Sequence, residues 1–126
     1  MTLREIAKRL ELTLRTSEQK LDAEVSGGYA SDLLSCVMAK ARKGNVWVTL
    51  QSHLNIVAVA ELLQLAAIIV TEGMAVDEPT LQKANEVGIP ILTTPATTFT
   101  VVGRLTQMGI AGADEPGGSW DKMTGQ

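Results

Sequence analysis

Aromatic, cysteine and histidine residues are scarce in this sequence. Aromatic residues make up 3% of the 126 residues, which argues against a surface that stacks nucleic-acid bases and leaves the core to aliphatic side chains. The single cysteine, Cys36, cannot form a disulfide within the chain, and its apolar neighbours predict a buried, inert thiol. The single histidine, His53, has no cysteine pair to accompany it, so we expect no metal site.

The sequence also lacks an excess of basic charge and a long apolar run. The net charge is −3, from 11 basic and 14 acidic residues, which argues against binding to nucleic acid. The densest basic run, Lys40, Arg42 and Lys43, falls where a helix is expected to end and suits the helix dipole. We find no signal peptide and no run of about 18 apolar residues. We therefore expect a cytoplasmic protein that does not contact a membrane.

The best-defined stretch of the chain is VWVTLQSHLNIVAVAELL, residues 46–63. Its first five residues form an apolar run rich in β-branched side chains, which is typical of a buried strand. A polar corner follows, and the apolar residues after it recur at helical spacing without Gly or Pro. This stretch therefore predicts a strand, a turn and a helix in succession.

The same succession repeats along the chain. Strand-like apolar runs start near Ala23, Val46, Ala67 and Ile89, about 22 residues apart, each followed by a helical pattern. With the alternating segment 11–15, they predict an α/β fold of three layers: a mainly parallel sheet of about five strands with helices on both faces. A chain of 126 residues with 45% hydrophobic residues fits one such domain.

Local signals set the expected helix boundaries. Thr2 and Glu5 form a capping-box pattern before a short amphipathic helix. We expect further helices over 31–42, over 54–65, from Asp77 to Gly88, and from an N-cap at Thr94 to near residue 109.

Two features of the second half of the chain complete the expected organisation. Gly103 lies inside the last expected helix, which suggests that the helix packs closely against a neighbour there. The composition changes after Ala111, so we expect an α/β domain over residues 1–110 and a disordered tail over residues 111–126.

Polar residues follow each expected strand and form the candidate ligand site. In an open α/β sheet, ligands bind beyond the carboxyl ends of the strands, where backbone N–H groups at helix N-termini attract small anions. The alternative is that each of these residues only caps a helix or forms a turn. The candidate ligand residues are Ser26, Gly27, Gly28, Gln51, Ser52, His53, Asn55, Thr71, Gly73, Thr93 and Thr94.

Sharper chemical interpretations of these segments fail. Gly27-Gly28 lacks the later glycines of a dinucleotide fingerprint and the Lys-Ser/Thr pair of a P-loop. Ser52 and His53 are sequence neighbours, and nothing marks a carboxylate that would orient the imidazole as a base. We therefore assign no catalytic residue and no cofactor.

The motifs VSGGYASDLLSCVMAKARKGNVWVTLQSHLNIVAVAELL, IIVTEG and DEPTLQKANEVGIPIL resemble the DRTGG domain over roughly residues 1–110. The chain is most similar to stand-alone members encoded near iron hydrogenases in anaerobic bacteria. The resemblance implies the fold of the N-terminal domain of HPr kinase, which is not the catalytic part of that enzyme. Related domains occur beside CBS domains in regulated pyrophosphatases and within some phosphate acetyltransferases, where they look regulatory or dimer-forming.

The resemblance extends to a few single positions. Gly27 and Gly28 match the glycine turn of the family, and Thr71 and Gly73 match its Thr-Gly-Gly motif, with Glu72 where the family usually has Gly. Ser52-His53 replaces the Asp-Arg pair of the family, which removes the side chain best suited to hold a phosphate.

Three functions follow from these observations. The first is a non-catalytic regulatory or adaptor domain, expected to be a homodimer that serves an anaerobic hydrogenase or redox system. Its expected partner face is Val37, Met38 and Ala41 on the helix over 33–41. The second is a sensor that binds a nucleotide or small anion at the strand ends. The third and weakest is a small hydrolase or transferase.

Overall fold

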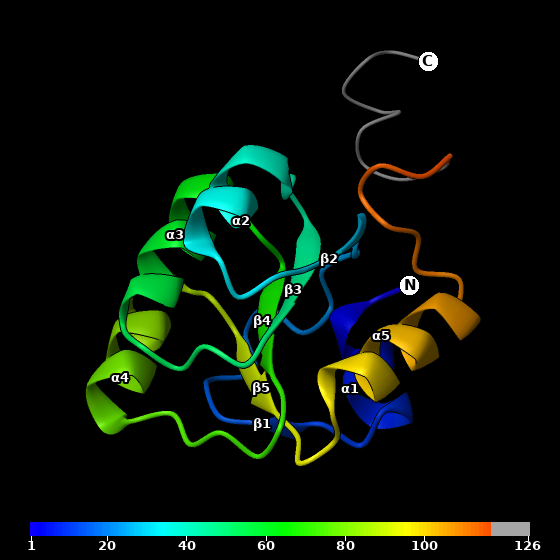
Figure 1. The fold of residues 1–126 in the computed structure, drawn as a ribbon. Coiled ribbons are helices and arrows are strands. Elements are labelled where there is room, and N and C mark those ends of the chain that lie inside the picture. Colours follow the sequence, from blue (N-terminus) through cyan, green and yellow to red (C-terminus); the bar gives the residue numbers. More distant parts are fainter. Residues whose placement is uncertain (117–126) are drawn as a thin grey trace.

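The computed structural model describes residues 1–116, which form a five-stranded sheet between two layers of helices (Figure 1). The elements in chain order are α1 (Leu3–Arg9), β1 (Thr13–Leu14), β2 (Gly27–Ala30), α2 (Leu34–Lys40), β3 (Asn45–Thr49), α3 (Asn55–Leu63), β4 (Ala67–Val70), α4 (Glu78–Val87), β5 (Ile91–Thr93) and α5 (Thr98–Gln107). The strand order is β1-β5-β4-β3-β2, with β2 to β5 parallel and β1 antiparallel at one edge. The predicted three-layer α/β fold is confirmed.

The central strand β3 shows how the sheet serves both layers. Its five residues are all buried, as expected of a parallel strand covered on both faces. Val46 and Val48 pack with α1 and α5, whereas Trp47 packs with α2, α3 and α4, because successive side chains of a strand point to opposite faces. The aliphatic core expected from the composition is therefore divided into two cores, one on each face of the sheet. The core between the sheet and α2, α3 and α4 also contains the large aromatic side chain of Trp47.

Several helix boundaries follow their local signals. Thr2 and Glu5 form the predicted capping box of α1. Asp77 caps α4 by accepting from the N–H of Thr80, and Gly88 ends α4 in the left-handed conformation. The Arg42 guanidinium donates to the carbonyls of Ala39 and Ala41 at the end of α2, which agrees with the expected role of the basic run.

The first strand of the repeat lies later than expected. The apolar residues near Ala23 pair with the N-terminus instead of the sheet, through Leu3 N–H to Ala23 O and Val25 N–H to Met1 O. Strand β2 therefore begins at Gly27, and Gly27 pairs with Asn45, the first residue of β3. The helix after β5 is also displaced, because its N-cap is Thr97 and not Thr94.

The chain returns to the sheet after α5. Gly28 donates to the carbonyl of Ala111, Ala113 donates to the carbonyl of Gly28, and Gly112 forms a parallel bridge with Gly28. Ala113 is 2% exposed. The prediction of a disordered tail from residue 111 is therefore wrong for these residues, and its part over 117–126 lies outside the described residues.

Three smaller expectations also differ from the structure. A Cβ added at Gly103 would meet no atom within 4 Å, so this glycine does not mark close packing. Cys36 is half-buried. Val37 and Ala41 are core residues, at 0% and 1% exposure, so the partner face expected on the helix over 33–41 keeps only Met38 at the surface.

Among the helices of residues 1–116, none has both the length and the apolar character that a membrane span requires.

Candidate functional site

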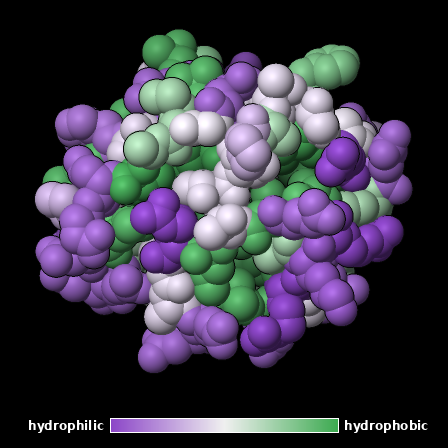
Figure 2. Space-filling view, turned by 90° about the horizontal axis from the view of Figure 1, so that it is seen from below, coloured by the Kyte–Doolittle hydropathy of each residue, from purple (hydrophilic) through white to green (hydrophobic). Residues whose placement is uncertain are grey.

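Four loops leave the carboxyl ends of the parallel strands and meet at one edge of the sheet, the edge seen in Figure 2. They are residues 31–33, 50–54, 71–77 and 94–97, which we call the carboxyl-edge loops. Because β2 to β5 are parallel, these loops share one side of the molecule. Of the predicted ligand residues, Gln51, Ser52, His53, Thr71, Gly73 and Thr94 lie in these loops, Thr93 ends β5, and Asn55 begins α3.

Gln51, Ser52 and His53 line an open hollow of about 290 Å³ at this edge. Leu50, Met74, Ala75 and Asp77 complete its wall. The exposed His53 ring accepts the N–H of Asn55 at its Nδ1, 3.2 Å away, so part of its hydrogen-bonding capacity serves the first turn of α3. This hollow combines one amide, one hydroxyl, one imidazole and one carboxylate with apolar side chains.

Thr71, Gly73 and Thr94 do not line the hollow. Their polar groups form hydrogen bonds within the loops after β4 and β5 and with the start of α5. The buried Thr71 hydroxyl lies 2.6 Å from the Thr98 hydroxyl and donates to the carbonyl of Thr49. Gly73, with φ +69°, donates its N–H to the carbonyl of Thr94. The Thr94 hydroxyl accepts the N–H of Ala96. These bonds hold the loop after β4 against the start of α5.

Glu72 occupies the N-terminus of α5 with its own carboxylate. Oε2 of Glu72 accepts the N–H of Thr98 at 2.8 Å, and the Glu72 N–H donates to the carbonyl of Ala96. The backbone of Glu72 has φ +64°, a conformation that favours glycine and costs other residues of the order of 1 kcal/mol. The acceptor that an anionic ligand would supply at this helix is thus supplied by the chain itself.

Asp32 is the polar residue of this edge that sequence reasoning missed. Its Oδ1 accepts both the Thr49 hydroxyl at 2.8 Å and the N–H of Leu50 at 2.9 Å. The Gln51 amide donates to the carbonyl of Asp32. The available signal was an acidic residue two positions beyond a strand, in the same row of polar residues at the strand ends.

The pKa of one carboxyl at the hollow is shifted. The Thr80 hydroxyl, 2.6 Å from Oδ1 of Asp77, is the main cause of a lowered Asp77 pKa, and the N–H of Thr80 adds to it. The electrostatic interaction with His53 makes a smaller contribution in the same direction. Within residues 1–116 no three His, Cys, Asp or Glu residues are grouped as a metal site would need.

Ser26, Gly27 and Gly28 lie at the other end of the strands. Gly27 and Gly28 belong to β2 and pair with the first residues of β3, and the Ser26 hydroxyl donates to the carbonyl of Lys43 at 2.7 Å. The prediction that these residues share an edge with His53 is therefore wrong. Because β2 starts later than expected, the two glycines lie at its amino end instead of beyond its carboxyl end.

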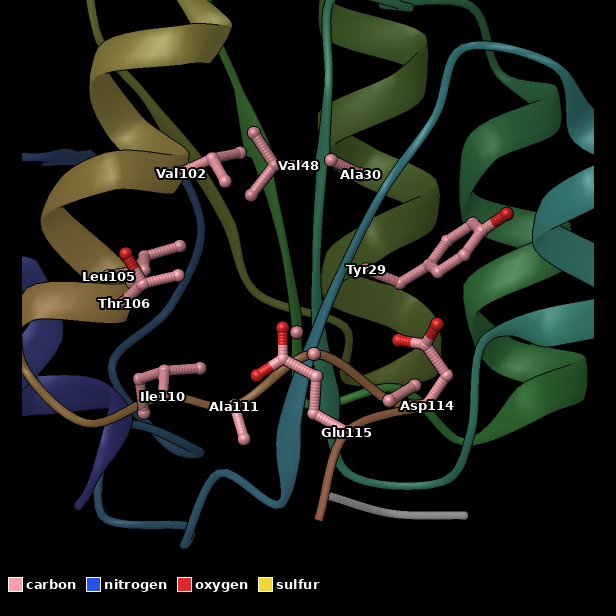
Figure 3. A pocket seen from close by; sticks show the side chains of 13 residues that line it. Tyr29, Ala30, Val48, Val102, Leu105, Thr106, Ile110, Ala111, Asp114 and Glu115 are labelled. Carbon is pink, nitrogen blue, oxygen red and sulfur yellow. The ribbon is translucent and has the colours of Figure 1, made fainter. Parts of the chain in front are cut away.

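Gly28 instead lines a second pocket, of about 220 Å³, between β2, α5 and the returning segment 110–115 (Figure 3). Figure 3 shows Val48 and Val102 at one end of this pocket and the carboxylates of Asp114 and Glu115 at the other. The small residues Gly28 and Ala30 leave this space beside the sheet. The alternation of small residues in β2 was a signal for it, but the wall formed by 110–115 was not foreseeable from local patterns.

Comparisons with known proteins agree with this fold. The sequence model of the DRTGG domain matches residues 5–108. A crystal structure of the CBS and DRTGG domains of the regulatory region of Clostridium perfringens pyrophosphatase, complexed with the activator diadenosine tetraphosphate, is similar with a TM-score of 0.69 and 17% sequence identity. The similarity covers 81% of this chain and 44% of that chain. No curated protein matches. The chain belongs to the DRTGG domain family.

Proposed function

We propose that the chain is a non-catalytic regulatory or adaptor domain that acts as a homodimer in the cytoplasm. The resemblance to stand-alone DRTGG proteins encoded near iron hydrogenases supports a role in an anaerobic hydrogenase or redox system. The presence of DRTGG and CBS domains in the regulatory region of a pyrophosphatase supports a regulatory role.

One observation carries this proposal: much of the polar chemistry at the carboxyl edge is used within the chain. Thr71 bonds to Thr98, Glu72 bonds to the N–H of Thr98, Asp32 bonds to Thr49 and Leu50, and His53 accepts the N–H of Asn55. A catalytic site needs a nucleophile or base that faces its substrate. An edge whose polar groups stabilise its own loops is better suited to contact another protein.

Two measurements test the proposal. Light scattering after gel filtration should give the mass of a dimer at micromolar concentration, and a monomer would reject the homodimer. Co-purification from the native host with mass spectrometry should recover a protein of a hydrogenase or redox system. Recovery of no such protein would reject the adaptor role.

A small-ligand sensor is the second candidate. It is supported by the hollow lined by Gln51, Ser52 and His53, and by the nucleotide activator bound in the similar pyrophosphatase region. AMP, ADP, ATP or diadenosine tetraphosphate should then raise the melting temperature of the wild type. The His53→Ala and Asn55→Ala variants should lose that increase. No shift with any of the four nucleotides would reject the sensor.

A further inference from the structure

Large apolar side chains are exposed mainly at the carboxyl edge. Among residues 1–116, seven large hydrophobic side chains are exposed, and four of them lie in the carboxyl-edge loops: Leu33, Leu50, Leu54 and Met74. A fifth, Phe99, is 89% exposed in the first turn of α5, which follows the last of these loops. Apolar groups collected on one face of a monomer mark an interaction site more often than scattered ones do.

Two of these exposed apolar residues line a depression in this edge. Leu50, from the loop after β3, and Met74, from the loop after β4, line the same hollow of about 290 Å³, together with Ala75. Figure 2 shows apolar surface in the middle of this edge with hydrophilic residues around it. An apolar centre with a polar border is the usual anatomy of a protein interface.

The charge of the border identifies the kind of occupant. The carboxyl-edge loops contain Asp32, Glu72 and Asp77 and no lysine or arginine, and His53 is their single group that can become positive. Lys8, Arg9 and Lys83 belong to the neighbouring helices α1 and α4. A second copy docked through this same edge would place carboxylates opposite carboxylates, and a phosphate would find no cation in these loops.

We propose that the carboxyl edge is the docking site for a protein partner that presents apolar side chains bordered by lysine or arginine. Leu50 and Met74 receive the apolar side chains, and Glu72 and Asp77 face the basic residues. Within residues 1–116, these two carboxylates accept hydrogen bonds through Oε2 of Glu72 and Oδ1 of Asp77, which leaves the second oxygen of each for the partner. This inference rests on the proposed adaptor function and specifies the chemistry of its partner.

The test is site-specific photo-crosslinking with the full chain in its native host. A benzophenone amino acid replaces Met74 in one variant and Leu62 in the control variant; Leu62 is 66% exposed on α3, away from the carboxyl-edge loops. We expect position 74 to crosslink to a partner peptide that contains lysine or arginine beside apolar residues. We expect position 62 to give several-fold less of that product. In extract containing about 0.5 M salt, where charges are screened beyond a few ångströms, the yield at position 74 should fall several-fold.

The other outcomes each overturn this inference. A crosslinked peptide from the chain itself would make the edge a contact between copies, and an acidic or uncharged peptide, or a yield that salt does not change, would remove the electrostatic argument. Capture at position 62 alone would overturn the docking site and leave the adaptor function standing. No capture at either position would also overturn it, and co-purification and light scattering would then decide the adaptor function separately.

Discussion

The two ends of the parallel strands carry similar residue types but use them differently. At the amino end, the fully buried Asn45 accepts the N–H of Arg42 at 2.9 Å and donates to the Ser26 hydroxyl at 3.2 Å. The Ser26 hydroxyl in turn donates to the carbonyl of Lys43. This chain of hydrogen bonds around the buried Asn45 joins the entry to β2 with the turn between α2 and β3.

The carboxyl end combines internal hydrogen bonds with exposed apolar groups. Thr71 is buried and bonded, yet Leu50 and Met74 beside it are 38% and 42% exposed. Buried polar groups without partners cost free energy, whereas exposed apolar groups gain free energy when a partner covers them. The amino end therefore uses its polar groups to hold the chain together, and the carboxyl end adds exposed apolar surface, which is the surface proposed here for docking.

Replacement of Asn45 tests the amino end and should have the largest effect. Asn45→Ala removes the hydrogen bonds of the buried amide with the Arg42 N–H and the Ser26 hydroxyl, so we expect the free energy of unfolding to fall by about 2–3 kcal/mol. Urea denaturation measures this loss. Asn55→Ala is the matched control, because Asn55 is exposed and contributes its backbone N–H to His53, and its effect should stay within about 0.5 kcal/mol. Equal losses in the two variants would contradict the comparison.

Replacement of Thr71 tests the polar contacts at the carboxyl end. Thr71→Val keeps the shape of the side chain and removes its hydroxyl bonds to Thr98 and Thr49, so we expect a loss of about 1–2 kcal/mol. The same change at Thr106, which is exposed on α5, should cost less than about 0.5 kcal/mol. A Thr71→Val variant as stable as the wild type in urea would show that these hydroxyl bonds do not stabilise the carboxyl end.

Much of the fold could be predicted because its signals are local. The run 46–63 separates into β3 and α3 from its periodicity alone, and Asp77 and Gly88 mark the two ends of α4. These signals depend on neighbours a few residues apart. The positions of β2 and of residues 111–113 depend on pairing with distant segments, the N-terminus and Gly28. Local patterns do not reveal such partners.

The sequence predicted where the candidate site lies but not all of the residues that form it. The polar residues after β3, β4 and β5 do meet at one edge, because parallel strands require it. The glycines of β2 were placed at that edge because the strand was expected too early. Leu50 was counted in the apolar run expected to form a buried strand, and local spacing indicated neither its exposure nor that of Met74.

Glu72 offers a finer test of how the carboxyl end is held. Glu72→Ala keeps a side chain at φ +64° and loses the bond to the Thr98 N–H, whereas Glu72→Gly loses the same bond and relieves the backbone strain. We therefore expect the glycine variant to be more stable than the alanine variant by about 1 kcal/mol in urea denaturation. An alanine variant equal to the glycine variant would show that residue 72 leaves this conformation readily.

The smallest expected effect is a pH dependence at Asp77. Its pKa in the folded protein is lowered from the ordinary value of 3.8, first by the Thr80 hydroxyl, then by the Thr80 N–H, and to a lesser degree by His53. A carboxyl with a lowered folded pKa binds more protons in the unfolded chain, so its stabilising contribution is complete well above pH 3.8 and is lost as the pH falls through the folded value. Asp77→Asn retains an N-cap residue, so its urea midpoint should match the wild type at neutral pH and fall less steeply below about pH 4.

His53→Ala should reduce the acid dependence of the urea midpoint by less than Asp77→Asn does, because the hydrogen bonds from Thr80 to Asp77 remain. If the urea midpoint of Asp77→Asn fell as steeply with acid as that of the wild type, the acid sensitivity would belong to other carboxyls. Asp22 is one of them, because the neighbouring Arg4 guanidinium lowers the pKa of Asp22.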